Sequence, residues 1–151
     1  TGKWMNRAHN LACFDEAVAL LRKYNIEVVV HIINGFPGED KTMMLNTLKH
    51  LNQLDIQGLK IHMLHIMKKT TLAHVYEQTP FKFLTLEEYV DVVVTQIEHL
   101  KPNVIVHRVT GDAPRDSLIA PLWTLKKFIV MNEIDKAMRA KNTYQGIYYK
   151  Q

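Results

Sequence analysis

Three segments of the chain place histidine, lysine or arginine within or just after an apolar strand pattern. Imidazole can ligate a metal or move a proton, and a guanidinium group can bind a carboxylate or phosphate through two parallel hydrogen bonds. The segments are His31-Ile32-Ile33-Asn34-Gly35-Phe36-Pro37-Gly38-Glu39, Lys60-Ile61-His62-Met63-Leu64-His65 and His107-Arg108-Val109-Thr110-Gly111-Asp112-Ala113-Pro114. They are the candidates for chemistry in this sequence.

The first segment ends a β-branched, apolar run with a glycine-rich turn. His31, Ile33 and Gly35 alternate, so they share one face of the predicted strand. Gly35 and Gly38 permit a sharp turn and a close approach of a ligand to the backbone. A buried parallel strand that leads through a tight turn into a helix places a small-molecule site at its carboxyl end. The alternative is an ordinary strand-to-helix turn in which the glycines serve geometry only.

The second segment alternates on a predicted strand. His62 and His65 are three residues apart, so on a regular strand they face opposite sides and cannot hold one metal together. Either histidine alone is also compatible with a packing role. Lys60 on a buried strand needs a partner or an anionic ligand to offset the cost of its desolvation.

The third segment places Arg108 at the end of a strand, where its guanidinium could bind a carboxylate or phosphate. The alternative is an ion pair with Asp112 or Glu39. Near the start of the chain, Arg7 and His9 belong to a polar cluster just before a helix, and there the alternative is a solvated loop.

The bulk properties predict one ordinary globular domain. The chain has 151 residues, 47% hydrophobic and 23% charged, with a formal net charge of +4. Its single cysteine, Cys13, excludes an internal disulfide framework and a self-contained iron–sulfur site, which takes three or four thiolates. No run approaches the roughly 20 apolar residues of a membrane span. We therefore expect a cytoplasmic location and no membrane partner.

The elements that must position these residues alternate along the chain. We predict an α/β fold with parallel strands near 26–34, 58–66 and 103–109. The predicted flanking helices cover about 14–24, 41–54, 85–100 and 122–141. Asp40 is the expected N-cap of the second of these helices, and Thr85 with Glu88 forms a capping box on the third.

Three parallel strands cannot close a barrel, and their outer strands would leave unpaired edges. The chain also begins at Thr1, and Thr1 to Asn10 reads as the middle of a longer sequence. We therefore expect a single domain that is a fragment of a longer protein. Its exposed edges would pair with the missing N-terminal half or, in a homodimer, with a second copy.

In their order, the motifs resemble the C-terminal half of radical S-adenosylmethionine (SAM) enzymes of the elongator-like and coproporphyrinogen-oxidase-like group, of the YhcC/YtqA type. Besides the three segments above, the matching pieces are Asn6-Arg7-Ala8-His9, the trailing Thr70 and Leu72, Pro121-Leu122-Trp123 and Gln145-Gly146. The resemblance implies the C-terminal part of a partial (β/α) TIM-like barrel. Residues 1–122 would form its strand–helix units, and residues 123–151 a last helix and tail.

The resemblance also implies cofactors and roles. A [4Fe–4S] cluster, held by three cysteines of the missing N-terminal half, would cleave SAM to a 5′-deoxyadenosyl radical. Ile33 would pack on the adenine, Gly35 would give backbone access, and the backbone from Leu64 to Ile66 would meet the adenine edge. The full implied sets are His31, Ile33, Gly35, Leu64, His65 and Ile66 for the cofactor, and Arg7, His9, His62 and Arg108 for the substrate; no residue is assigned to a metal.

The sequence departs from the family pattern in two respects. The motif often has glycine where His31 stands, and its acidic position falls on Asp40, with Glu39 beside it. The cysteine motif is absent, so the fragment is expected to be inactive alone. The YtqA-type resemblance further implies an oxidoreductase-like role in modifying the wobble uridine of transfer RNA.

Two other functions remain open from the residues alone. The first is a metal-dependent hydrolase in which His31, His62 and His107 converge on Zn²⁺ at the strand ends. The second is a non-catalytic module that binds RNA or a partner through the basic last helix, which includes Lys126 and Lys127. For that helix, a solvated charged face is the simpler interpretation.

Overall fold

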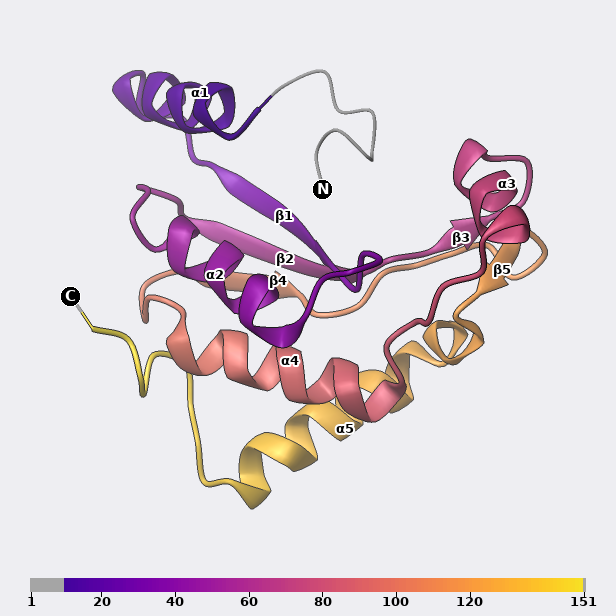
Figure 1. Ribbon diagram of the computed structural model, residues 1–151. Coiled ribbons are helices and arrows are strands. Elements are labelled where there is room, and N and C mark those ends of the chain that lie inside the picture. Colours follow the sequence, from indigo (N-terminus) through magenta and orange to yellow (C-terminus); the bar gives the residue numbers. More distant parts are fainter. Residues whose placement is uncertain (1–9, 151) are drawn as a thin grey trace.

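The computed structural model describes residues 10–150 and is built around a parallel three-stranded sheet (Figure 1). Its strands are β1 (Val29–Asn34), β2 (Gly58–Met63) and β4 (Ile105–Arg108), in the order β1-β2-β4. Both pairings are parallel, as the sequence predicts. Each strand is shorter than its predicted range of 26–34, 58–66 or 103–109, because the flanking residues turn away from the ladder.

Helices lie along one face of the sheet and beyond its β1 strand. They are α1 (Leu11–Lys23), α2 (Lys41–Leu51), α4 (Leu86–His99) and α5 (Lys127–Ala140). In Figure 1, α2, α4 and α5 lie on the same side of the sheet, and α1 lies beyond the β1 strand. Their apolar side chains form one core with the inward side chains of β1 and β2, among them Ile32, Leu59 and Ile61. Removing such side chains from water is the main stabilising contribution to the layer.

Local capping explains where two of the helices begin. The Asp40 carboxylate accepts a hydrogen bond from the Met43 backbone N–H at 2.8 Å and starts α2. Thr85 and Glu88 form the predicted capping box at the start of α4, each side chain accepting from the other residue's backbone N–H. These short-range bonds satisfy backbone donors that the first helical turn leaves free.

A second, smaller unit lies beyond the carboxyl ends of β1 and β2 (Figure 1). It contains an antiparallel ribbon of β3 (Ile66–Met67) and β5 (Leu118–Ala120), with α3 (Thr71–Gln78). Phe36, Leu64 and Ile66 are buried in its separate apolar cluster. The sequence analysis predicted no strand at the position of β5 and extended the second strand to residue 66. Instead, the chain leaves β2 after Met63 and Ile66 joins the ribbon.

The predicted helix from 122 to 141 is two elements. A 3-10 helix, η1 (Leu122–Leu125), ends at Lys126, and α5 begins at Lys127. Lys126 has φ of −101° and ψ of 55°, which is not a helical conformation, so the two helices are not continuous. The Trp123 indole N–H donates to the Leu84 carbonyl at 3.0 Å and holds η1 beside the start of α4.

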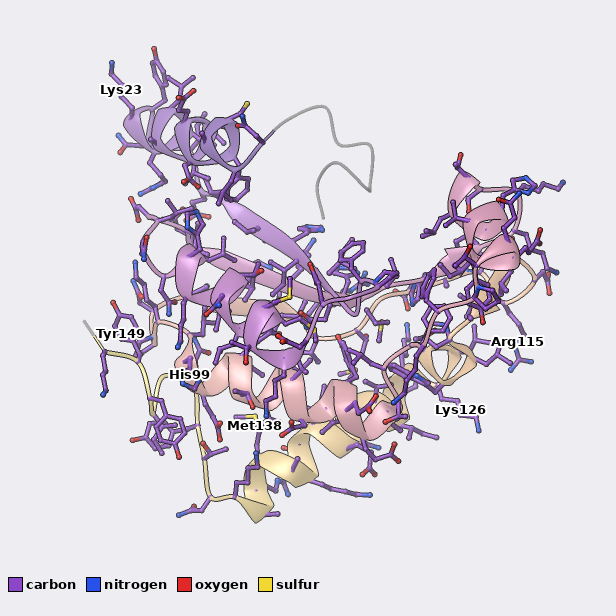
Figure 2. All side chains as sticks on the ribbon, in the orientation of Figure 1. Lys23, His99, Arg115, Lys126, Met138 and Tyr149 are labelled. Carbon is purple, nitrogen blue, oxygen red and sulfur yellow. The ribbon has the colours of Figure 1, made fainter. Side chains whose placement is uncertain are left out.

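The tail after α5 returns along the far end of α4. Gly146 N–H donates to the Ile97 carbonyl and Tyr148 N–H to the Glu98 carbonyl. Figure 2 shows Tyr149 and His99 together on one side of the molecule, while Arg115 and Lys126 lie on the other side. The tail therefore packs away from the carboxyl ends of the strands. Among the described residues, no helix is long and apolar enough to cross a membrane.

Candidate active site

The carboxyl ends of β1 and β2 are held side by side. Their register pairs Asn34 with Met63, and the Leu64 N–H donates to the Asn34 carbonyl at 2.9 Å just beyond the strands. Gly35 follows with φ of +95°, a conformation that side-chain-bearing residues avoid. The predicted turn is therefore present, and it brings the backbone of Gly35 close to that of Leu64.

The sheet face opposite the helices carries side chains that the core does not cover; we call it the open face. Along β1 the exposed residues Val29, His31 and Ile33 alternate with buried ones. Register places Lys60 beside His31 and His62 beside Ile33, and both of these β2 side chains are half-buried. The predicted alternation is thus confirmed, and His31, Ile33 and His62 share the open face.

His31 and His62 stack across the two strands, with ring centroids 5.5 Å apart and planes 13° from parallel. Burial lowers the pKa of His62, and electrostatic repulsion from His31, Arg108, His65 and Lys60 lowers it further. Both effects favour the neutral form of the His62 ring over the protonated form.

His65 lies closer to His62 than a regular strand would allow. A methyl group built on Gly111 would meet the His65 ring at 2.9 Å and the His62 ring at 3.2 Å, so both rings flank Gly111. The prediction that they face opposite sides is wrong, because β2 ends at Met63. Gly111 N–H donates to the Met63 sulfur at 3.2 Å. Burial lowers the pKa of His65, and the Asp112 carboxylate opposes that shift.

Arg108 forms an ion pair with Asp112, which is one of the two partners that the sequence analysis gave as the alternative to ligand binding. Its guanidinium donates to the Asp112 carboxylate at 2.9 Å, and Lys127 at the start of α5 donates to the other oxygen at 3.2 Å. The Lys127 hydrogen bond is the largest cause of a lowered Asp112 pKa, with the charges of Lys127, Arg108 and His62 adding to it. Asp112 therefore joins β4 to α5.

The three histidines proposed for a metal-dependent hydrolase do not converge. His107 lies over Gly58 at the amino end of β2, where its Nε2 is 2.5 Å from the position of an added methyl group. His31 lies in the middle of β1, and His62 lies near the carboxyl end of β2. Within residues 10–150, no group of three or more histidine, cysteine, aspartate or glutamate side chains could hold a metal ion. The geometry therefore does not support the hydrolase.

The remaining predicted residues are placed as follows. Leu64 and Ile66 are buried in the cluster of the ribbon, with 7% and 0% of their surface exposed. Arg7 and His9 lie outside the described residues.

The basic last helix is largely neutralised. Lys127 is paired with Asp112, and Lys136 with Glu133 at 2.8 Å. Arg139 pairs with Asp135 at 3.0 Å. Nucleic-acid footprints present unpaired positive charge to phosphates, so these pairs favour the solvated-face interpretation over a binding module.

The sequence analysis missed two polar residues that support the site. Asn34, the last residue of β1, forms a reciprocal amide pair with Gln96 of α4, and both are almost wholly buried. Gln96 also donates to the Met44 carbonyl at 3.1 Å. The available signal was an amide at Gln96 close to the apolar residues Val92–Val94 and Ile97. Lys127 was noted only as part of a basic face.

Comparisons with known proteins bear on this arrangement. Residues 56–140 match the model of the Radical_SAM C-terminal domain. The chain is 43% identical over 150 residues to YtqA of Bacillus subtilis, covering 99% of this chain and 47% of that protein. It is 35% identical over 132 residues to YhcC of Escherichia coli K12, covering 87% and 43%. The chain thus spans less than half the length of these relatives.

A solved structure shares the fold. Elp3 of the archaeon Methanocaldococcus infernus, with an N-terminal deletion, superposes with a TM-score of 0.80 at 19% identity. The match covers 95% of this chain and 34% of that one. It confirms the predicted α/β fold class.

Proposed function

Because this chain belongs to the Radical_SAM C-terminal domain family, we propose that it supplies part of the SAM and substrate site of a radical SAM enzyme. The observation that carries the proposal is the open face. It offers both apolar and cationic side chains at the carboxyl ends of β1 and β2, which is where parallel α/β sheets bind ligands.

The strand ends suit an adenine ring. Ile33 is 39% exposed on the open face. Two residues later, Gly35 has no side chain that would cover its own backbone. An apolar surface beside an accessible backbone is the usual composition of a small-molecule site. In this proposal, Ile33 packs on the ring, Gly35 and the backbone of residues 64–66 meet its edge, and His31 and His65 complete the surroundings.

The iron–sulfur cluster does not fit this chain alone. Cys13 is its only cysteine, and a cluster takes three or four thiolates. We therefore assign the cluster to the remainder of the full-length protein, here called the parent. When bound there, the cluster and SAM supply a 5′-deoxyadenosyl radical. The residues of this chain orient the cofactor and substrate, and the helices behind the sheet close that side to water.

The free edge of β1 supports the same arrangement. Among the described residues β1 pairs only with β2, so one edge of the sheet carries unpaired backbone groups. We propose that the preceding half of the parent covers this edge. A dimer that forms with the isolated chain and is lost in the parent would support this; a parent that dimerises through the same edge would contradict it.

Purified parent, reconstituted with iron and sulfide without oxygen, tests the proposal. We expect broad iron–sulfur absorbance and release of 5′-deoxyadenosine from SAM under reduction. Ile33→Ser should raise the KM for SAM about tenfold, which matches the loss of roughly 1.4 kcal/mol of binding. A colourless parent, or one that releases no 5′-deoxyadenosine, would contradict the proposal.

Val29→Ser is the matched control. Val29 and Ile33 lie on the same face of the same strand and are 38% and 39% exposed, but Val29 is at the amino end. The control should therefore leave the KM unchanged. Equal effects of the two substitutions would indicate loss of stability rather than loss of cofactor contact.

We further propose that the substrate is transfer RNA, modified at the wobble uridine at the aminomethyl side-chain stage. The YtqA-type motifs and the basic excess of the chain support this proposal. Mass spectrometry of nucleosides from a strain without the parent should show a changed wobble uridine, restored by the wild-type gene. An unchanged nucleoside profile would contradict the RNA substrate and leave the radical chemistry standing.

A further inference from the structure

Several cationic side chains gather on the open face. Lys60 and Arg108 are register partners across β2 and β4. His62 lies two residues along β2 from Lys60 and stacks on His31. The charges of Lys60, Arg108 and His31 all act on His62, so the four groups occupy one neighbourhood.

Asp112 is the carboxylate that pairs with Arg108 of this neighbourhood, and it is shared. Asp112 receives hydrogen bonds from both Arg108 and Lys127. Lys60 makes no side-chain hydrogen bond or ion pair with any of residues 10–150, although it is half-buried. A half-buried ammonium group without a counter-ion is costly, and an anion that enters the site removes this cost.

The histidines add an unused hydrogen-bonding group. The Nε2 atom of His62 is enclosed and has no hydrogen-bond partner in the described part of the chain. The ring of His31, which stacks on the His62 ring, makes no hydrogen bond with the described residues either. An anion that binds to these imidazoles would therefore break no hydrogen bond of theirs within residues 10–150.

We propose that Lys60, His62 and Arg108 form an anion subsite that takes a phosphate or carboxylate group of the substrate. Asp112 acts as an internal counter-ion that holds Arg108 until the anion arrives. On binding, Arg108 turns from Asp112 to the anion, and Asp112 keeps its hydrogen bond with Lys127. The location of the substrate rests on the proposed function, but anion binding itself requires neither SAM nor the cluster.

The test measures anion binding to the 151-residue chain by calorimetry and by the histidine NMR signals. Inorganic phosphate and succinate are the two probes, and the one that binds more tightly identifies the chemical source. Lys60→Gln and Arg108→Gln should each weaken binding about tenfold, because each removes a charge-assisted hydrogen bond. Asp112→Asn should strengthen binding severalfold, because it frees Arg108.

A second ion pair provides the matched controls. Arg139 and Asp135 have the same four-residue spacing and nearly the same distance as Arg108 and Asp112, but they lie on α5. Arg139→Gln and Asp135→Asn should leave anion affinity unchanged. An unfolded protein would lose anion affinity, so a gain of affinity in Asp112→Asn cannot result from unfolding. This variant therefore still tests the proposal if a Lys60 variant folds poorly.

Three outcomes would overturn the proposal. The first is that neither probe binds, and the second is that the variants at Lys60 and Arg108 bind the probes as tightly as wild type. The third is that SAM displaces the anion from the parent. The last would assign the subsite to the carboxylate of the cofactor instead of the substrate. Release of 5′-deoxyadenosine by the parent is measured separately, so a failure here leaves the proposed function intact.

Discussion

Asn34 and Gln96 hydrogen-bond each other in both directions, at 2.8 and 3.0 Å, although they are 62 residues apart in sequence. The pair joins the last residue of β1 to the middle of α4, where only 2% and 1% of the two residues are exposed. Buried amides carry a large desolvation cost that such reciprocal bonds offset. The pair therefore fixes the point at which the chain turns toward Gly35.

Breaking this amide pair should destabilise the chain. We expect Asn34→Leu to lower the free energy of unfolding by about 2 kcal/mol, because it leaves the Gln96 amide buried without its partner. The double variant Asn34→Leu/Gln96→Met should lose less than the sum of the two single losses. Urea unfolding of all four proteins measures the coupling. Strict additivity would show that the two amides do not act as a pair.

The capping box of α4 should make a local contribution. Thr85→Ala removes the hydroxyl that accepts from the Glu88 N–H at 3.1 Å, and we expect a loss of about 1 kcal/mol in unfolding free energy. Thr47→Ala, at an exposed position inside α2, is the control for the loss of a threonine hydroxyl from a helix. If both substitutions cost the same, the cap does not anchor α4.

Protonation of His62 and His65 should weaken the fold in mild acid. Burial lowers both pKa values below the ordinary 6.5, so the unfolded chain binds protons more readily than the folded one. Stability is then complete above pH 6.5 and falls as the pH drops below it. Unfolding free energies between pH 5 and 8 should show a shallower decline for His62→Gln and His65→Gln.

The exposed His74 of α3 supplies the control for this pH dependence. His74→Gln should keep the wild-type decline between pH 7 and 5. An unchanged decline in both buried-histidine variants would mean that other groups cause the acid sensitivity.

Gly146 should be required for attachment of the tail. It has φ of +82°, and an added methyl group would lie 2.7 Å from Pro102 and 3.1 Å from the Leu100 carbonyl oxygen. We expect Gly146→Ala to release residues 143–150, which hydrogen exchange at the Tyr148 amide would reveal as lost protection. Gly38→Ala is the control that separates backbone strain from steric clash. Gly38 has a similar φ of +79°, but a methyl group there would meet no atom within 4 Å. Retained protection at Tyr148 in Gly146→Ala would contradict this.

Local patterns predicted the parts of the fold that short-range chemistry decides. The β-branched run before Asn34, the Asp40 cap and the Thr85–Glu88 box all depend on residues within four positions of one another. They correctly placed the parallel strands and the starts of two helices. The alternation on β1 also correctly grouped His31 with Ile33 on one face.

Long-range contacts decided the parts that the sequence did not reveal. The strand pattern continues through Leu64 and Ile66, but burial of both in a second apolar cluster draws the chain out of β2 and moves His65 next to Gly111. Helical periodicity runs through residue 126, but the backbone leaves the helical conformation at Lys126, and η1 bonds through Trp123 to the distant Leu84 carbonyl. Neither contact partner is near in sequence, so no local window contains the signal.

The irregular pairing between β2 and β4 shows where this strand can change in length. Leu59 pairs with Val106, but Lys60 pairs with Arg108, so His107 is an extra residue in the ladder. Without His107, Val106 and Arg108 would be successive residues opposite Leu59 and Lys60, so the residues from Arg108 onward would keep their present faces. The pair between Asp112 and Lys127 should therefore survive such a deletion. Homologous sequences that keep this pair should include some that lack the residue at position 107.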